Sequence, residues 1–212
     1  MEWLDFKLTG QYSLPVNARD GQGARGKLIR AGTELFRRQG YSATSVDSIV
    51  EAAGVSKGSF FYHFENKEEL AVACLAGWDE MVRNTMQGAP FMQMEDPVQR
   101  LQGCLDFFIA MFSDPTAYPS CLVGTTVQEV AESNPTLRDA AQQCFVHAVE
   151  DLGGLIELAG LARGRELDGQ ALAGLWMATL QGSLLMAKAS GDLDRIPANL
   201  RSQREYILGL LE

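Results

Sequence analysis

The sequence lacks long apolar segments. No run of 18 apolar residues occurs among its 212 residues, so it predicts no membrane-spanning helix. The first residues also lack the basic-then-apolar pattern of a signal peptide. We therefore expect a cytoplasmic protein.

Residues that serve metal sites and catalytic centres are also scarce. The four cysteines form no CxxC pair, and the chain has only two histidines. His147 and Asp151 are four apart on an expected helix, but two ligands are too few to hold a metal ion. No nucleophile motif or phosphate-binding loop accompanies His147. The sequence therefore predicts reduced thiols, no metal site, no cofactor and no enzymatic activity. The cysteines are Cys74, Cys104, Cys121 and Cys144.

Acidic residues dominate the second part of the chain. Residues 71–212 contain nine Lys/Arg against eighteen Asp/Glu, whereas residues 25–70 contain seven against six. Residues 1–24 contain two against three. The middle segment is therefore the part suited to nucleic acid, and the acidic remainder would repel bulk DNA. The basic side chains placed to reach phosphates are Arg25, Lys27, Lys57 and Lys67.

Apolar residues recur at helical spacing, and no segment has the alternation of a strand. Capping residues and Gly or Pro stops divide the chain into nine expected helices. The Met-rich segment 91–94 is expected to be a loop. The sequence therefore predicts an all-α fold. The expected helices cover about 26–39, 45–53, 57–63, 67–86, 97–112, 120–132, 135–161, 168–190 and 197–211.

Residues 44–69 contain two short helices around a glycine turn. Thr44 or Ser45 can cap the first helix, which Gly54 ends in a left-handed conformation. Ser56 can cap the second helix, which has only about two turns. This plan is typical of a helix-turn-helix, whose short second helix enters the major groove. The outward residues that can meet a phosphate or a base edge are Lys57, Gly58, Ser59, Tyr62 and His63.

Residues 26–70 resemble the DNA-binding head of TetR-family transcriptional regulators. The matching motifs are Leu35-Phe36, Gly40-Tyr41, Thr44-Ser45, Ala53–Ser56, Tyr62–Phe64 and Asn66-Lys67. One position departs from the family pattern, because Phe61 stands where the family usually has a tyrosine. A phosphate contact expected from that hydroxyl is therefore missing or made by another residue.

The resemblance implies a three-helix head at residues 25–70 and a helical-bundle body at residues 71–212, preceded by an irregular arm at residues 1–24. The body would bind a small-molecule inducer, which releases the repressor from palindromic operator DNA. For the DNA contacts, we expect Lys57 and Ser59 to meet base edges and Gly58 to allow close backbone approach. The residues expected to grip phosphates are Thr44, Tyr62, His63 and Lys67.

The expected eighth helix is apolar on two faces, so it needs both its own core and another chain as partners. The family resemblance implies that the last two helices of each subunit form a homodimer interface. A dimer also suits the mechanism, because a single two-turn recognition helix reads too few base pairs.

Polar or aromatic residues on apolar faces are candidates for the ligand pocket. For each of them, an ordinary place in the core is the alternative. The candidates are Trp78, Phe108, Met111, Tyr118, Cys121, Thr125, Gln128, His147, Trp176 and Gln181.

Cys121 supports an alternative function. With Ser120 as the cap, Cys121 would lie in the first turn of the sixth helix, where free backbone N–H groups stabilise a thiolate. The segment 120–129 also resembles a TetR subgroup that includes regulators responding to electrophiles and small unsaturated acids. The alternative is therefore a cysteine-based electrophile or redox sensor, and the simpler interpretation is a small buried hydrophobe.

Overall fold

The structure, a computed structural model, describes residues 23–113 and 120–212, and every regular element in them is helical. The predicted all-α fold is therefore confirmed. Among these described helices, none is long and apolar enough to cross a membrane. The elements are α1 (Ala24–Gln39), α2 (Val46–Ala53), α3 (Lys57–His63), α4 (Lys67–Gln87), the 3-10 helix η2 (Pro90–Gln93), α5 (Pro97–Met111), α6 (Leu122–Val130), α7 (Pro135–Ala162), α8 (Gly169–Ser190) and α9 (Arg195–Gly209).

Polar caps begin most helices at the predicted positions. Each capping side chain accepts a hydrogen bond from a backbone N–H in the first turn, which satisfies a group that the helix itself leaves unpaired. Gly54 ends α2 with φ +63°, the left-handed conformation expected there. The caps are Ser45, Ser56, Asn66, Asp96, Asn134 and Asp168.

Two local predictions were wrong. Residues 91–94 do not form a plain loop, because most of them belong to η2. The sixth helix begins at Leu122 rather than Ser120, and its N-cap is Cys121, which makes no side-chain cap bond. Ser120 does not cap the helix, because it lies one residue before the N-cap and its buried hydroxyl has no hydrogen-bond partner among the described residues.

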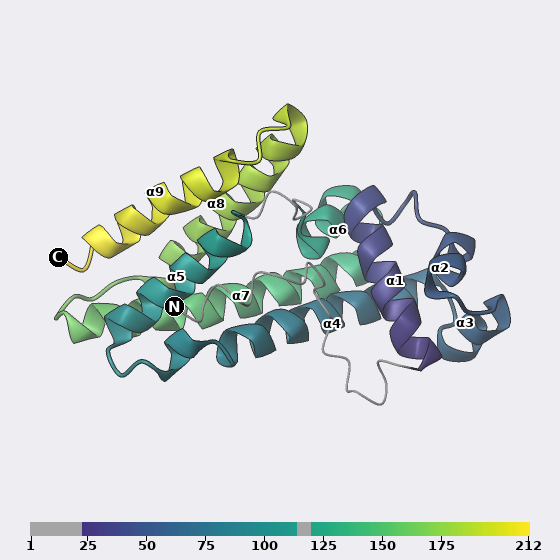
Figure 1. Cartoon of the computed structure of the whole chain (residues 1–212), viewed down its shortest axis with the longest axis horizontal. Helices are drawn as coiled ribbons and strands as arrows, with labels where there is room; N and C mark the ends of the chain where they lie inside the picture. Colours follow the sequence, from purple (N-terminus) through teal and green to yellow (C-terminus); the bar gives the residue numbers. More distant parts are fainter. Residues whose placement is uncertain (1–22, 114–119) are drawn as a thin grey trace.

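The helices pack around two apolar cores. One lies beneath α1, α2 and α3 and continues along α4 into α6 and the first half of α7. The other is formed by α5, the second half of α7, α8 and α9. Figure 1 shows α2 and α3 at one end of the molecule and α8 with α9 toward the other. Cys121 packs against both cores, so the start of α6 lies at their junction.

Candidate nucleic-acid interface and ligand cleft

The recognition helix α3 is held by its buried aromatic residues. Phe60 and Phe64 are almost fully buried, as predicted, with their rings 5.9 Å apart. Because a helix of seven residues has only one buried face, the other face must project into solvent. Lys57 and Gly58 are exposed there, and Tyr62 is 84% exposed.

Three further residues of α3 are at least partly exposed: Ser59, Phe61 and His63. His63 is half-buried, and its ring meets that of Tyr62 edge to face at 4.9 Å. Ser59 is half-buried, and its backbone N–H donates to the Ser56 cap. Phe61, the departure from the family pattern, is 53% exposed, so it offers an apolar ring where a hydroxyl was expected. An exposed phenyl ring at this position can contact a thymine methyl group.

Lys57 has an acidic partner in the free protein. Its Nζ lies 2.7 Å from Oδ1 of Asp47, which is on α2. Both side chains are mostly exposed, so the pair contributes little to stability. The lysine can therefore exchange this carboxylate for a base edge or a phosphate at low cost.

Two of the predicted phosphate contacts point inward. Thr44 is buried, and its hydroxyl donates to the Gly40 carbonyl at 2.6 Å. The Lys67 ammonium donates to the carbonyls of Tyr41 and Thr44, both at 2.8 Å, and lies 4.1 Å from the centre of the Tyr41 ring. Burial lowers the pKa of Lys67. Since an ammonium has three protons, Lys67 braces the turn before α2 and keeps one donor for another partner.

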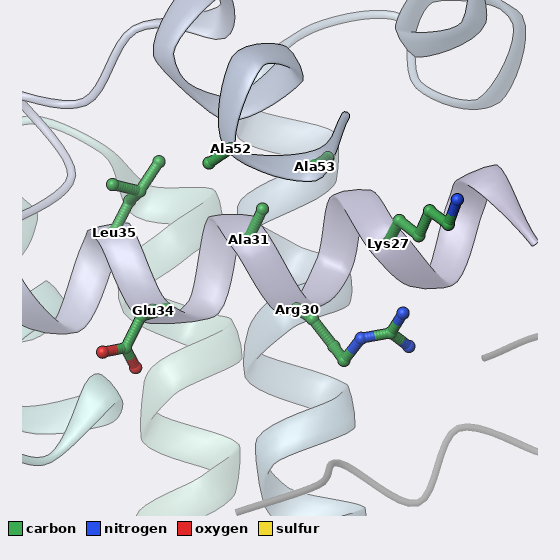
Figure 2. Close-up of a pocket in the computed structure, with 7 residues that line it drawn as sticks. All are labelled: Lys27, Arg30, Ala31, Glu34, Leu35, Ala52 and Ala53. Carbon is green, nitrogen blue, oxygen red and sulfur yellow. The ribbon is translucent and has the colours of Figure 1, made fainter. Parts of the chain in front are cut away.

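An open groove of about 400 Å³ lies on the head between α1 and the end of α2. Figure 2 shows Ala31 and Leu35 of α1 facing Ala52 and Ala53, while Glu34 points away. None of the predicted ligand residues lines it. The charged residues Lys27, Arg30 and Glu34 also line the groove, and we assign no function to it.

A narrow cleft between α6 and α8 brings together four of the predicted ligand residues: Cys121, Thr125, Gln128 and Gln181. Its volume of about 10 Å³ is enough for roughly one water molecule. The other four lining residues were not predicted as ligand contacts: Ser120, Leu184, Leu185 and Lys188. Lys188 could have been selected from the sequence, because it is the only charged residue in α8, which is otherwise largely apolar.

The other predicted ligand residues lie outside this cleft. Trp176 is buried in the body core, with the Phe108 ring edge-on at 6.3 Å. Met111 is half-buried at the end of α5. Trp78 lies under the Arg37 guanidinium, and His147 Nδ1 is 2.7 Å from Asp79 Oδ2 of α4. The structure thus gives these five residues packing or pairing positions, and Tyr118 lies outside the described residues.

Contacts from α6 and α7 connect the body to the head. The Glu129 carboxylate accepts the Ser42 N–H at 2.9 Å, just after the end of α1. Asn134 Nδ2 donates to the Glu68 carboxylate at 2.5 Å. Arg37 Nη2 lies 3.5 Å from the Ser120 carbonyl. The start and the end of α6 therefore both touch the head.

The cysteines differ in accessibility. Burial raises the pKa values of Cys74, Cys104 and Cys144 to about 12, so these thiols stay protonated at neutral pH. Cys121 is half-buried and lines the cleft. Within residues 23–113 and 120–212, no three His, Cys, Asp or Glu side chains are grouped to hold a metal ion.

The outer face of α8 is apolar, as the sequence predicts. Leu175, Leu185 and Met186 are each about half exposed, and so is Tyr206 of α9. The opposite face of α8 is buried around Trp176 in the body core. The helix therefore has one covered apolar face and one open apolar face.

Comparison with known proteins identifies the architecture. The family profile for bacterial regulatory proteins of the tetR family matches residues 28–74. The profile for the C-terminal domain of LmrA/YxaF-like transcriptional regulators matches residues 97–198.

Individual proteins agree with both profiles. An uncharacterized HTH-type transcriptional regulator in the lacX 3′ region of Lactococcus lactis subsp. lactis is 26% identical over 82% of this chain and 87% of its own length. The HTH-type transcriptional repressor DhaR of Mycobacterium sp. (strain GP1) is 29% identical over 77% and 82%. The crystal structure of a TetR transcriptional regulator from Chloroflexus aurantiacus covers 90% of this chain and 96% of its own, with a TM-score of 0.76 and 28% identity. The chain therefore belongs to the TetR family of transcriptional regulators.

Proposed function

We propose that this protein is a ligand-responsive repressor that binds a palindromic operator as a homodimer. The observation that carries the proposal is α3, a helix of seven residues that is anchored by Phe60 and turns Lys57 and Tyr62 into solvent. In a helix-turn-helix, the N-terminal residues of the second helix contact base edges. The relative DhaR, named a repressor, supports the direction of control.

The exposed residues of α3 fall into two groups, those that would contact base edges and those that would contact phosphates. Lys57, in the first turn, suits the O6 and N7 acceptors of guanine, and Gly58 lets the backbone approach closely. Ser59 can meet a neighbouring base edge. Tyr62 and His63, one turn later, suit phosphate oxygens. Lys67 would add a phosphate contact beside the start of α2 through its one remaining ammonium proton. Thr44 would support it indirectly, because its hydroxyl and N–H already donate to Gly40 and Tyr41.

Dimerisation is supported by the open apolar face on α8 and α9. Burying half-exposed Leu175, Leu185 and Met186 against a second copy would remove apolar surface from water. Two heads would then bind half-sites about one helical turn apart, roughly 34–36 Å. A single α3 reads too few base pairs to select an operator.

Regulation would begin in the cleft between α6 and α8. A small molecule that widens the cleft would displace α6, whose Glu129 touches the head, together with Ser120 just before it, whose carbonyl also touches the head. A coupling free energy of about 1–3 kcal/mol changes operator affinity several-fold to about a hundredfold. The contacts between α6 and the head thus provide a route by which ligand binding in the cleft would change the position of the head.

Selection from random duplexes tests the proposal. Purified protein should enrich a palindrome, and the double variant Lys57→Ala, His63→Ala should lose that enrichment. Arg165→Ala is the matched control, because it removes an exposed positive charge from the loop before α8. Enrichment that survives in the double variant, or that is absent from the folded wild type, contradicts the proposal.

Cys121 favours a second candidate function, because it is half-buried while the other three thiols are buried and protonated. An electrophilic alkene would add to the Cys121 thiolate, forming a C–S bond while the resulting carbanion takes a proton from water. Cys121→Ser should abolish release of operator DNA by such a compound and leave release by a reversible ligand intact. Release by the electrophile that persists in Cys121→Ser would reject the sensor.

A further inference from the structure

We propose that Phe61 selects a thymine in each half-site of the operator, by packing its ring against the 5-methyl group of that base in the major groove. The inference rests on the proposed function, because it names a base that α3 would contact. The observation behind it is an exposed apolar ring on the side of α3 that would meet DNA.

Phe61 lies on the exposed side of α3, one turn after Lys57. Successive residues of an α-helix are about 100° apart, so Phe61 lies between Lys57 and Gly58 around the helix axis. All three are exposed, whereas Phe60 is fully buried. Figure 1 shows α3 at one end of the molecule, where this side is open. Phe61 therefore shares the side of α3 on which Lys57 would contact a base edge.

The exposed apolar surface of the head is concentrated at this place. Among the described residues of the head, Phe61 and Tyr62 are the exposed large hydrophobic side chains, and both belong to α3. Tyr62 has a hydroxyl that can donate to a phosphate oxygen. Phe61 has no polar atom in its side chain, so it cannot replace the phosphate contact of a tyrosine. Its contact with DNA must therefore be an apolar one.

The Phe61 ring is supported by the core of the head. Its centroid lies 5.2 Å from that of the Phe60 ring, and the two planes meet at 78°, an edge-to-face arrangement. Because Phe60 is fully buried, this contact restrains the exposed ring from one side. A side chain that is already restrained loses less conformational entropy when it binds.

Space for a base lies beside the ring. A Cβ atom at Gly58 would meet only Ser56 Oγ, at 3.8 Å, so the surface in front of this glycine is open. Gly58 is exposed and lies three residues before Phe61, which places the two on neighbouring parts of the same side of α3. DNA can therefore approach the backbone closely at Gly58 and bring a base edge alongside the ring.

Thymine is the base that suits a phenyl ring. The major-groove edges of guanine, adenine and cytosine present hydrogen-bond donors and acceptors, whereas thymine also presents a methyl group. Packing this methyl group against Phe61 removes apolar surface of both partners from water. Opposite any other base, the ring would displace water from a polar edge and give no hydrogen bond in return.

Deoxyuridine substitution tests the inference, because uracil pairs as thymine does and lacks only the methyl group. The wild-type protein first selects its palindrome from random duplexes, which tests the proposed function separately. Deoxyuridine then replaces thymine at one symmetric pair of positions at a time, and fluorescence anisotropy measures Kd at a fixed salt concentration. At one such pair, loss of the two methyl groups should weaken binding about tenfold.

Phe61→Ala should remove the difference between the thymine and uracil duplexes, because the ring that contacts the methyl group is absent. Selection repeated with this variant should no longer enrich thymine at that position. Tyr62→Phe is the matched control, since it removes only a hydroxyl from the adjacent exposed ring. It should weaken both duplexes equally and keep the tenfold difference. Phe61 is 53% exposed, so Phe61→Ala should fold, and thermal unfolding verifies this.

The inference is overturned if the selected half-site contains no thymine, if no uracil substitution weakens binding, or if the loss caused by uracil persists in Phe61→Ala. Continued enrichment of thymine at that position by Phe61→Ala also overturns it. A selected palindrome without a uracil effect removes the thymine contact and leaves the proposed repressor standing. Failure of the folded wild type to select any palindrome contradicts the proposed function, and the thymine contact falls with it.

Discussion

The head and the body place their polar groups in opposite ways. In the head, Lys57 and Tyr62 project into solvent from a helix whose start is capped by Ser56. In the body, the Ser120 hydroxyl and the Gln181 amide nitrogen are shielded from solvent near α6, whose start has no side-chain cap. DNA is a large polyanion that approaches from solvent, so donors for it must project. A small ligand must be surrounded, so donors for it must converge inward.

The head and the body also differ in their balance of acidic and basic residues. Residues 25–70 have a slight excess of basic residues, whereas residues 71–212 have twice as many acidic as basic ones. An acidic body disfavours contact with DNA, which agrees with the proposed binding through the head. Lys188 is a local exception inside the acidic body, and it lies in the cleft.

The largest expected effect distinguishes the residue that anchors α3 to the core of the head from the residues of α3 that are expected to contact DNA. Phe60 is fully buried and holds α3 to the core, so Phe60→Ala should lower the free energy of unfolding of the head by about 3–5 kcal/mol. Operator binding should be lost, while the proposed dimer through α8 and α9 should persist. Urea denaturation followed by circular dichroism and light scattering measure the two properties.

Phe61→Ala is the matched control, because it truncates the neighbouring ring, which is 53% exposed. Its effect on the free energy of unfolding should stay within about 0.5 kcal/mol. Equal losses of stability in the two variants would mean that α3 is not anchored through Phe60. Loss of the dimer in Phe60→Ala would mean that the body depends on the head to fold.

A smaller effect concerns the joint between head and body. Gly40 has φ +89° and ψ 166°, a conformation that residues with a Cβ rarely adopt, so Gly40→Ala should cost about 1–3 kcal/mol. Its Cβ would also overlap the Glu129 carboxylate and displace it from the Ser42 N–H. Operator affinity and the free energy of unfolding should both fall.

The control for backbone strain alone is Gly54→Ala, since Gly54 has φ +63° and a Cβ there would meet no neighbour. A double-mutant cycle with Glu129→Ala isolates the contact, because the carboxylate is then absent. We expect Gly40→Ala and Glu129→Ala to be non-additive. Additive costs would show that Glu129 does not connect α6 to the head.

The sequence predicted the head better than the cleft for a physical reason. Ser45, Ser56 and Gly54 act on groups within a few residues of themselves, so their roles are visible in short motifs. The cleft depends on Ser120 and Gln181, which packing alone brings together. Sequence reasoning therefore predicted the nine α-helices of residues 23–113 and 120–212 and the exposed face of α3. It treated Ser120 as a cap because burial by distant residues leaves no local pattern.

The smallest effect compares the two kinds of helix start directly. The Ser45 hydroxyl accepts the Ser48 N–H at 3.0 Å, and Ser48 Oγ accepts the Ser45 N–H in return. Ser45→Ala should therefore lower the free energy of unfolding by about 1 kcal/mol. At the start of α6, Cys121→Ser should have the opposite sign and raise stability by up to about 1 kcal/mol, because it supplies a capping oxygen where none acts.

Urea denaturation of both variants measures the signs, and Ser42→Ala is the control for removing a serine hydroxyl that caps no helix. A destabilised Cys121→Ser would mean that the thiol contributes more by packing between the two cores than a cap would gain. A stabilised Cys121→Ser would show that the start of α6 in the wild type lacks a capping oxygen that the backbone there can use.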